Sequence, residues 1–254
     1  MSELTARPAD ALVMVGRCVR LSRRNVDALL TSLLLPVILM LLFVYLFGGA
    51  IDTGSAYVTY VVPGVLLLCA GFGAASTAVS VTTDLATGVI ERFRTMDVGG
   101  TAILAGHVVA SVVRNAVATV LVLAVAVAIG FRPAVDPPRW LAAAGVLLLF
   151  LLAVSWLSAA FGLLARTPEA ANGFTFLAMF LPYPSSAFVP VETMPTWLRG
   201  FADHQPVTPV IETLRALLLD TPAGSAPAHA VAWCLGILVI SMVVAAVLFR
   251  RRIA

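Results

Sequence analysis

The chain has 254 residues, of which 61% are hydrophobic and only 11% charged, whereas a soluble domain carries about a quarter charged residues. This composition excludes an ordinary soluble domain, and uncharged runs of about 20 residues, long enough to cross a bilayer, fill most of the chain. The net charge of +3 comes from arginine alone, in short clusters, so nucleic-acid binding has little support.

The first segment, residues 1–28, is predicted to lie outside the membrane core. Between Asp10 and Asp27, apolar residues recur at helical spacing on one face and arginines on another. This pattern predicts an amphipathic helix in the inner membrane interface. The alternative is a solvated leader whose arginines only set the topology. The first apolar run, beginning near Leu29, is too long for a signal-peptide core, so we expect it to remain as an anchor.

Six apolar runs predict an all-α, polytopic membrane domain over residues 29–254. They lie near residues 29–47, 58–81, 107–129, 140–164, 173–191 and 230–249. Six spans put both termini on one side. If that side is the cytoplasm, the inner segments hold eleven arginines and the outer segments four, as expected because cytoplasmic loops retain arginine near helix ends. We therefore expect a multi-pass protein of the plasma membrane, the inner membrane of a bacterium, with both termini cytoplasmic.

The loop after the second run carries a helical apolar stripe in a polar, cytoplasmic context. The stripe consists of Leu85, Val89, Phe93 and Met96, with Glu91, Arg92 and Arg94 around it. An apolar stripe on a water-facing loop indicates a partner surface. The alternative is a loop folded back against the membrane or its own helix ends.

Two further short helices are predicted between the fifth and sixth runs, within residues 192–228. Pro195 can open the first, and Thr208-Pro209 is typical of an N-cap followed by a proline at the first helical position. Neither helix is long enough to cross a bilayer. Both are therefore expected to be interfacial or re-entrant on the outer side.

The predicted spans lack the chemistry of a proton-driven pump or an intramembrane enzyme. No Asp or Glu falls inside them, and ionisable groups at membrane depth usually mark function. His107 is expected to be a satisfied interfacial histidine, and Arg114 either a structural anchor or part of the substrate path. The glycine-rich stretch from Gly71 to Ser76 indicates close helix packing and not nucleotide binding. Because the chain has no lysine, it cannot form a Gly-x-x-x-x-Gly-Lys phosphate loop, so energy for uphill transport must come from another subunit.

Several stretches resemble one family, the type-2 ATP-binding-cassette exporter permeases, and within it the daunorubicin-resistance-type drug-efflux subunits. They are Gly88-Val-Ile-Glu-Arg-Phe-Arg-Thr-Met96, Ala165-Arg-Thr-Pro-Glu-Ala170, Ala187-Phe-Val-Pro-Val-Glu-Thr-Met-Pro-Thr-Trp-Leu198, Gln205-Pro-Val-Thr-Pro-Val210 and Leu214-Arg-Ala216. Two departures are His204-Gln205-Pro206, where the family often has Asn-Pro, and the proline-interrupted Pro182-Tyr183-Pro184-Ser185-Ser186.

The resemblance implies a permease that is not itself an enzyme and binds no cofactor, with ATP and Mg held by a separate ATPase. It implies an N-terminal interfacial helix, a coupling helix near residues 85–96 seated on that ATPase, and outer re-entrant helices. It also implies two permease copies with two ATPase copies.

The expected function is export of amphiphilic drugs or other hydrophobic compounds. The alternatives are an exporter of lipid-linked glycans or lipids from the same superfamily, or a non-transporting assembly or sensor subunit. Aromatic and methionine side chains are dense in the fifth run and offer adaptable apolar contact to varied ligands. The predicted cargo path comprises Phe174, Phe176, Met179, Phe180, Tyr183 and Phe188. Packing against lipid and neighbouring helices is the alternative role for each.

Overall fold

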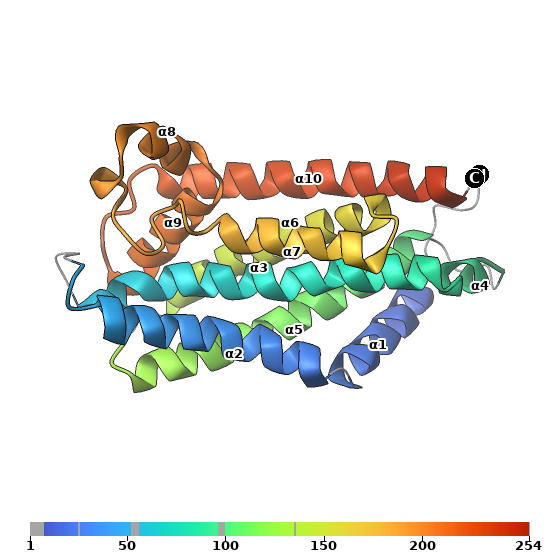
Figure 1. Cartoon of the computed structure of the whole chain (residues 1–254), viewed down its shortest axis with the longest axis horizontal. Helices are drawn as coiled ribbons and strands as arrows, with labels where there is room; N and C mark the ends of the chain where they lie inside the picture. The colour runs from blue at the N-terminus through green and yellow to red at the C-terminus, as the bar shows by residue number, and fades with distance from the viewer. Residues whose placement is uncertain (1–7, 25, 52–55, 96–99, 135, 254) are drawn as a thin grey trace.

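A computed structural model describes residues 8–24, 26–51, 56–95, 100–134 and 136–253, and every regular element in these ranges is helical. In chain order they are α1 (Pro8–Arg24), α2 (Val26–Leu42), the π-helix η1 (Phe43–Phe47), α3 (Tyr57–Ala86), α4 (Val89–Thr95), α5 (Gly100–Ala128), α6 (Pro137–Leu164), α7 (Pro168–Phe180), the 3-10 helix η2 (Val191–Thr193), α8 (Thr196–His204), α9 (Val207–Leu219) and α10 (Ala226–Ile253). The long helices lie side by side along one axis (Figure 1).

Four of these helices, α3, α5, α6 and α10, are long and apolar enough to cross a membrane. The membrane-embedded, all-helical character predicted from the sequence is therefore confirmed for the described residues. The fifth apolar run differs from its prediction. The pattern predicts a span to about residue 191, but α7 ends at Phe180 and residues 181–189 form turns. Pro182 and Pro184 cannot donate backbone hydrogen bonds, which explains why the helix stops there.

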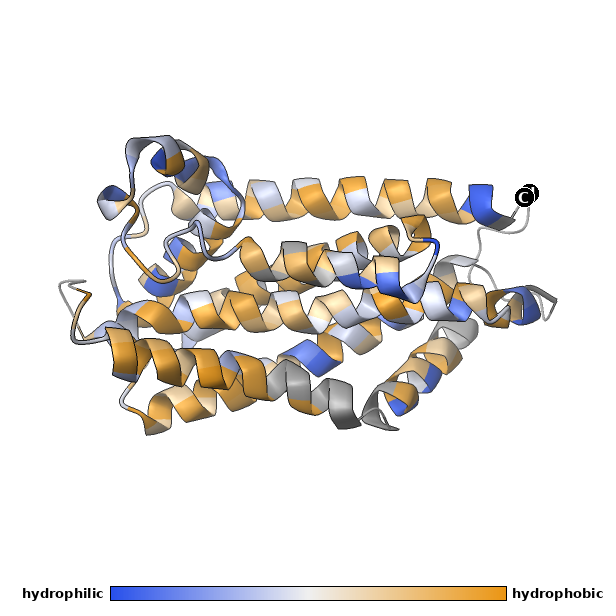
Figure 2. Cartoon of the chain, viewed as in Figure 1, coloured by the Kyte–Doolittle hydropathy of each residue, from blue (hydrophilic) through white to orange (hydrophobic). Residues whose placement is uncertain are grey.

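The two ends of the bundle carry different elements. α4 lies at one end, together with α1 and the last turns of α10, which carry Arg250, Arg251 and Arg252. We call this the α4 end. η2, α8 and α9 lie at the opposite end, the α8 end (Figure 1). Hydrophilic residues gather at both ends, whereas the middle of each long helix is mainly hydrophobic (Figure 2), as expected for a chain that spans a bilayer.

α3 is the central helix. In its 18-residue hydrophobic stretch, 83% is buried inside the bundle. Glycines allow several of these contacts. A Cβ added at Gly64 would lie 2.7 Å from the Cα of Ala187, and one at Gly162 would lie 2.6 Å from the carbonyl oxygen of Ala78. Gly71 likewise lies close to the backbone of α7. This contact agrees with the interpretation of the glycine-rich stretch as a site of helix packing.

Hydroxyl groups join α3 to α6 within the bundle. The Ser158 Oγ donates to the Ala74 carbonyl at 2.6 Å and accepts from the Ala78 N–H at 3.0 Å. The Thr82 Oγ1 donates to the Gly162 carbonyl at 2.8 Å. These buried hydroxyls are thus satisfied where water is excluded.

Candidate functional site

α4 carries most of the predicted coupling residues. The chain reverses between α3 and α4 at Gly88, whose φ of +67° is a conformation that favours glycine. Met96 and the side chain of Arg94 lie outside the described part of the chain. The other members of the predicted apolar stripe are each partly buried: Leu85, Val89 and Phe93.

The apolar side of α4 packs against its own chain. Ile90 is only 2% exposed and forms a cluster with Met14 of α1 and Ile103 of α5. Glu91 and Arg92 are exposed. The α4 surface open to a partner is therefore more charged than the stripe alone indicates. Leu85 and Phe93 of the stripe pack beside this cluster and stay partly exposed, so a partner contact for the stripe remains a prediction.

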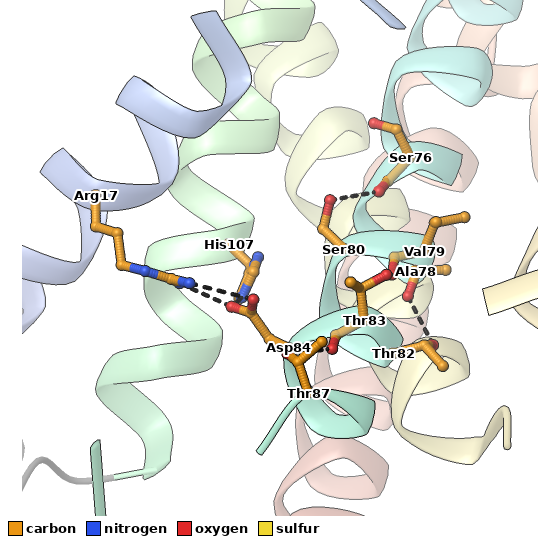
Figure 3. A network of polar contacts seen from close by, with 10 residues as sticks. All are labelled: Arg17, Ser76, Ala78, Val79, Ser80, Thr82, Thr83, Asp84, Thr87 and His107. Carbon is orange, nitrogen blue, oxygen red and sulfur yellow. Dashed lines mark hydrogen bonds and ion pairs between the residues drawn. The ribbon is translucent and has the colours of Figure 1, made fainter. Parts of the chain in front are cut away.

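Three ionisable side chains meet beside α4 and form what we call the charge cluster: Arg17 of α1, Asp84 of α3 and His107 of α5. Arg17 donates from its two terminal nitrogens, Nη1 and Nη2, to the Asp84 carboxylate, at 2.7 and 3.2 Å. The Nε2 of His107 lies 3.1 Å from the same carboxylate. Figure 3 shows Arg17 and His107 pointing at Asp84 from two different helices. A carboxylate that accepts from a guanidinium and faces an imidazole nitrogen can remain charged where water is scarce.

Arg17 also connects the charge cluster to α4. Its guanidinium carbon lies 5.1 Å from the centroid of the Phe93 ring, within the range of a cation–π contact. The hydrogen bond to Asp84 raises the pKa of Arg17 above its ordinary value, so the guanidinium stays charged at any physiological pH. A single side chain of α1 therefore contacts both the end of α3 and the buried side of α4.

Asp84 is the site residue that the sequence analysis misses. The apolar run ends near Val81, which assigns Asp84 to a loop. The helix continues to Ala86, and the Thr82 and Thr83 hydroxyls are satisfied within it by donating to carbonyls one turn earlier, at 2.9 and 2.8 Å. A carboxylate within one turn of an apolar run is the signal that could have identified it.

The two ionisable residues that the sequence places near the spans have defined partners. His107 is 7% exposed and satisfied by Asp84, as expected for a structural histidine. Arg114 donates to the Gly73 carbonyl at 2.8 Å and lies 3.4 Å from the Thr77 hydroxyl, both on α3. These contacts tie α5 to α3 and suit the anchoring role considered for Arg114. Among the described residues, no group of three or more His, Cys, Asp or Glu could hold a metal ion.

The predicted cargo-path residues separate into an exposed and a buried group. Phe176 and Phe180 are exposed on α7, by 64% and 59%. Tyr183 is half-buried, with its ring 6.0 Å from that of Phe180. The side chain of Met179 lies outside the described residues.

The buried group packs inside the chain. Phe174 lies against Phe161 of α6, with ring centroids 5.1 Å apart. Phe188 stacks on Phe43 at 4.2 Å and on Tyr183 at 5.2 Å. A ligand on the exposed face of α7 would therefore meet Phe176 and Phe180, while Phe174 holds α7 against α6.

Residues 181–189, which we call the proline turn, are not helical, so their carbonyls lack the regular backbone hydrogen bonds of a helix. Neighbouring side chains donate hydrogen bonds to several of these carbonyls. The Gln205 amide donates to the Pro184 carbonyl, the Arg215 guanidinium to Ser186 at 2.7 Å, and the Tyr57 hydroxyl to Phe188 at 2.9 Å. Irregular backbone at membrane depth is tolerated when protein covers it. Here it is covered by α3, α9 and Gln205, which lies between α8 and α9.

Arg215 makes the most extensive of these contacts. Besides Ser186, it donates to the Tyr60 carbonyl at 3.2 Å, and its guanidinium carbon lies 3.8 Å from the centroid of the Tyr60 ring. Gln205 and Arg215 belong to the sequence stretches that carry the family resemblance. Their position in the structure gives these stretches a physical role, which is to hold the proline turn against α3.

Comparison with known proteins finds matches over most of the chain. A model of the family described as ABC-2 type transporter matches residues 10–219. The daunorubicin resistance ABC transporter permease protein DrrB1 of Streptomyces coeruleorubidus is 34% identical over 195 residues, covering 76% of this chain and 69% of that protein. The probable doxorubicin resistance ABC transporter permease protein DrrC of Mycobacterium tuberculosis is 23% identical over 248 residues, covering 96% and 89%.

Proposed function

This chain belongs to the ABC-2 type transporter family, and from that membership we propose that it is the membrane-spanning permease subunit of an ATP-driven exporter. The permease is not the catalytic subunit; the family implies a separate ATP-binding-cassette ATPase as its partner. ATP and Mg are assigned to that partner, and this chain is proposed to bind no cofactor.

The cargo we propose is amphiphilic drugs or other hydrophobic compounds, moved out of the cell. The observation that carries this proposal is the 34% identity to a permease named for daunorubicin resistance. The exposed Phe176 and Phe180 on α7 support it, because aromatic rings bind apolar molecules of varied shape. We place the path along this face of α7, at the midline between two permease copies.

We propose six membrane spans, two more than the four helices that qualify by length and composition. α2 has 17 residues and η1 continues it for 5, so together they reach about 33 Å, enough for a hydrocarbon core. α7 has 13 residues, about 20 Å, and would need the proline turn to complete a crossing. Residues 1–28 would form the interfacial N-terminal region and residues 29–254 the transmembrane domain.

The orientation we propose places the α4 end in the cytoplasm of a bacterium and the α8 end outside its inner membrane. The three arginines that end α10 support it, since cytoplasmic segments retain basic residues. α1 would then lie in the inner interface, where Leu12, Val13 and Leu21 are exposed and could enter the lipid. α8 and α9 would be the outer re-entrant helices.

The assembly we propose contains two copies of this chain and two ATPase copies. The exposed Glu91 and Arg92 of α4 would contact the ATPase. ATP binding, by closing the two ATPases together, would alternate the permease pair between inward-open and outward-open arrangements.

The test is to express the chain with the ATPase encoded beside its gene and to reconstitute the complex in lipid vesicles. We expect hydrophobic drugs to stimulate ATP hydrolysis and to be transported in an ATP-dependent way. The control is the same complex with a catalytically inactive ATPase. Stimulation by lipid-linked glycans alone would favour the glycan-exporter alternative. An ATPase that never co-purifies with the permease would favour a non-transporting role.

A further inference from the structure

Three helices, α1, α3 and α5, meet at Asp84. Asp84 lies in the last turn of α3, accepts hydrogen bonds from Arg17 of α1, and contacts His107 of α5. Arg17 in turn lies over Phe93 of α4. Among α3, α5, α6 and α10, the four long helices, Asp84 is the only acidic residue.

Because Asp84 is buried, its negative charge depends on the groups that pair with it. The residue is 9% exposed, so its charge is stable only while cationic groups surround it. Both partners come from other helices, so their pairing links α1 and α5 to the end of α3. Nearby apolar packing adds to this link, because Met14, Ile90 and Ile103 join α1, α4 and α5 in one cluster. A displacement of α4 would therefore act on Arg17 and, through Asp84, on α3.

We propose that the charge cluster is the joint through which movement of α4 reaches the membrane spans, with Asp84 as its positioning residue. This inference rests on the proposed function. In it, the ATPase displaces α4, Phe93 displaces the Arg17 guanidinium, and the pairing with Asp84 forces α1 and α3 to move together. Hydrolysis is then coupled to opening of the spans.

The first experiment removes the charge and keeps the shape. Asp84→Asn is compared with Asp84→Glu, which retains the carboxylate, and with Asp220→Asn, which removes an exposed carboxylate paired with Arg139 at the α8 end. We expect all three to assemble with the ATPase. Asp84→Asn should lower the amount of drug transported per ATP hydrolysed by about fivefold or more, the size of a typical coupling between sites. Asp84→Glu should recover most of it, and Asp220→Asn should match the parent.

The second experiment uses Cys18, which lies on α1 next to Arg17 and is 5% exposed. With Cys69 and Cys234 replaced by alanine, maleimide labelling of Cys18 reports how often α1 separates from its neighbours. We expect the labelling rate to differ between the nucleotide-free complex and one trapped with ATP. In Asp84→Asn, we expect labelling to be faster and to lose this dependence on nucleotide.

Two results would contradict the proposed coupling role of the charge cluster. One is a parent complex that transports while Cys18 labels equally in both nucleotide states. The other is Asp84→Asn transporting as much drug per ATP as Asp220→Asn. If the parent complex neither hydrolyses ATP in response to drugs nor transports them, the proposed function fails instead, and the two failures are thereby distinguished.

Discussion

At the scale of single residues, one close helix contact in the core depends on a glycine, which has a hydrogen atom where other residues have a side chain. Gly162 of α6 faces the backbone of Ala78 on α3, and the obstacle to any Cβ there is a carbonyl oxygen, which cannot rotate aside. Gly145 lies on the same helix with nothing within 4 Å of an added Cβ. The two glycines therefore form a matched pair.

We expect Gly162→Ala to destabilise the purified permease by about 1–3 kcal/mol, because overpacking must push α3 and α6 apart. Gly145→Ala should leave stability unchanged or raise it by up to about 1 kcal/mol, since alanine favours the helix. Thermal unfolding in detergent measures both. Equal melting temperatures for the two variants would contradict the contact between α3 and α6.

Arg215 shows how one side chain can fix a non-helical segment. Arg215→Lys keeps the charge but cannot reach the Ser186 and Tyr60 carbonyls in the same planar arrangement. We expect a loss of about 1–3 kcal/mol, because buried acceptors would be left unpaired. The measurement is thermal unfolding together with protease sensitivity of the proline turn. The control is Arg132→Lys, an exposed arginine at the same end. Equal melting temperatures for Arg215→Lys and Arg132→Lys would show that the proline turn does not depend on Arg215.

At the scale of elements, α4 has two sides with different expected roles. Phe93 packs against Arg17 inside the chain, so Phe93→Ala should lower the melting temperature of the permease alone, by the equivalent of about 1 kcal/mol. It should also weaken coupling. Glu91 is exposed, so Glu91→Arg should leave that melting temperature unchanged and reduce co-purification of the ATPase.

These two readouts separate an internal contact from a partner contact. If Phe93→Ala changes only assembly, the ring belongs to the ATPase interface and not to the chain's own packing. If Glu91→Arg has no effect on assembly, the ATPase binds another segment.

α7 and the proline turn form the element on which cargo specificity is expected to depend. We expect Phe180→Ala and Tyr183→Ala to change which compounds stimulate ATP hydrolysis, because they remove neighbouring aromatic surface from α7 and the proline turn. Complex assembly should be unaffected. The measurement is a panel of drugs on the reconstituted complex, with Phe201→Ala, an exposed aromatic of α8, as the control. Identical drug profiles for all the variants would remove α7 from the path.

The sequence predicts these elements unevenly, for physical reasons. Long apolar runs identify α3, α5, α6 and α10 because lipid imposes one requirement along the whole helix. The end of α7 is predicted too late, although Pro182 and Pro184 mark it, because the apolar character continues beyond the helix. Asp84 is missed because its partners, Arg17 and His107, are 67 and 23 residues away in the chain and meet it only after folding. Gln205 and Arg215 are found only through a resemblance, since no periodicity indicates that they bind carbonyls.

At the scale of the whole molecule, the energy source lies outside the chain. The purified permease should hydrolyse no ATP, because without lysine it has no phosphate-binding loop of the usual kind. Native mass spectrometry of the complex should give two permeases and two ATPases. ATP hydrolysis by a preparation in which mass spectrometry detects only this chain would contradict the first expectation, and a single permease copy would contradict the second.

Six long-range polar contacts of the bundle share a direction, which has an evolutionary consequence. Ser158, Thr82, Arg114, Arg215, Gln205 and Tyr57 all donate to backbone carbonyls of other segments. A carbonyl is present whatever the side chain, so the accepting position can mutate without losing the bond, while the donor cannot. Among homologues we therefore expect the donors to vary more slowly than the acceptors, apart from acceptors such as Gly162 that close packing constrains. Such an asymmetry would let a transporter diversify the surface that meets its cargo while its architecture is inherited unchanged.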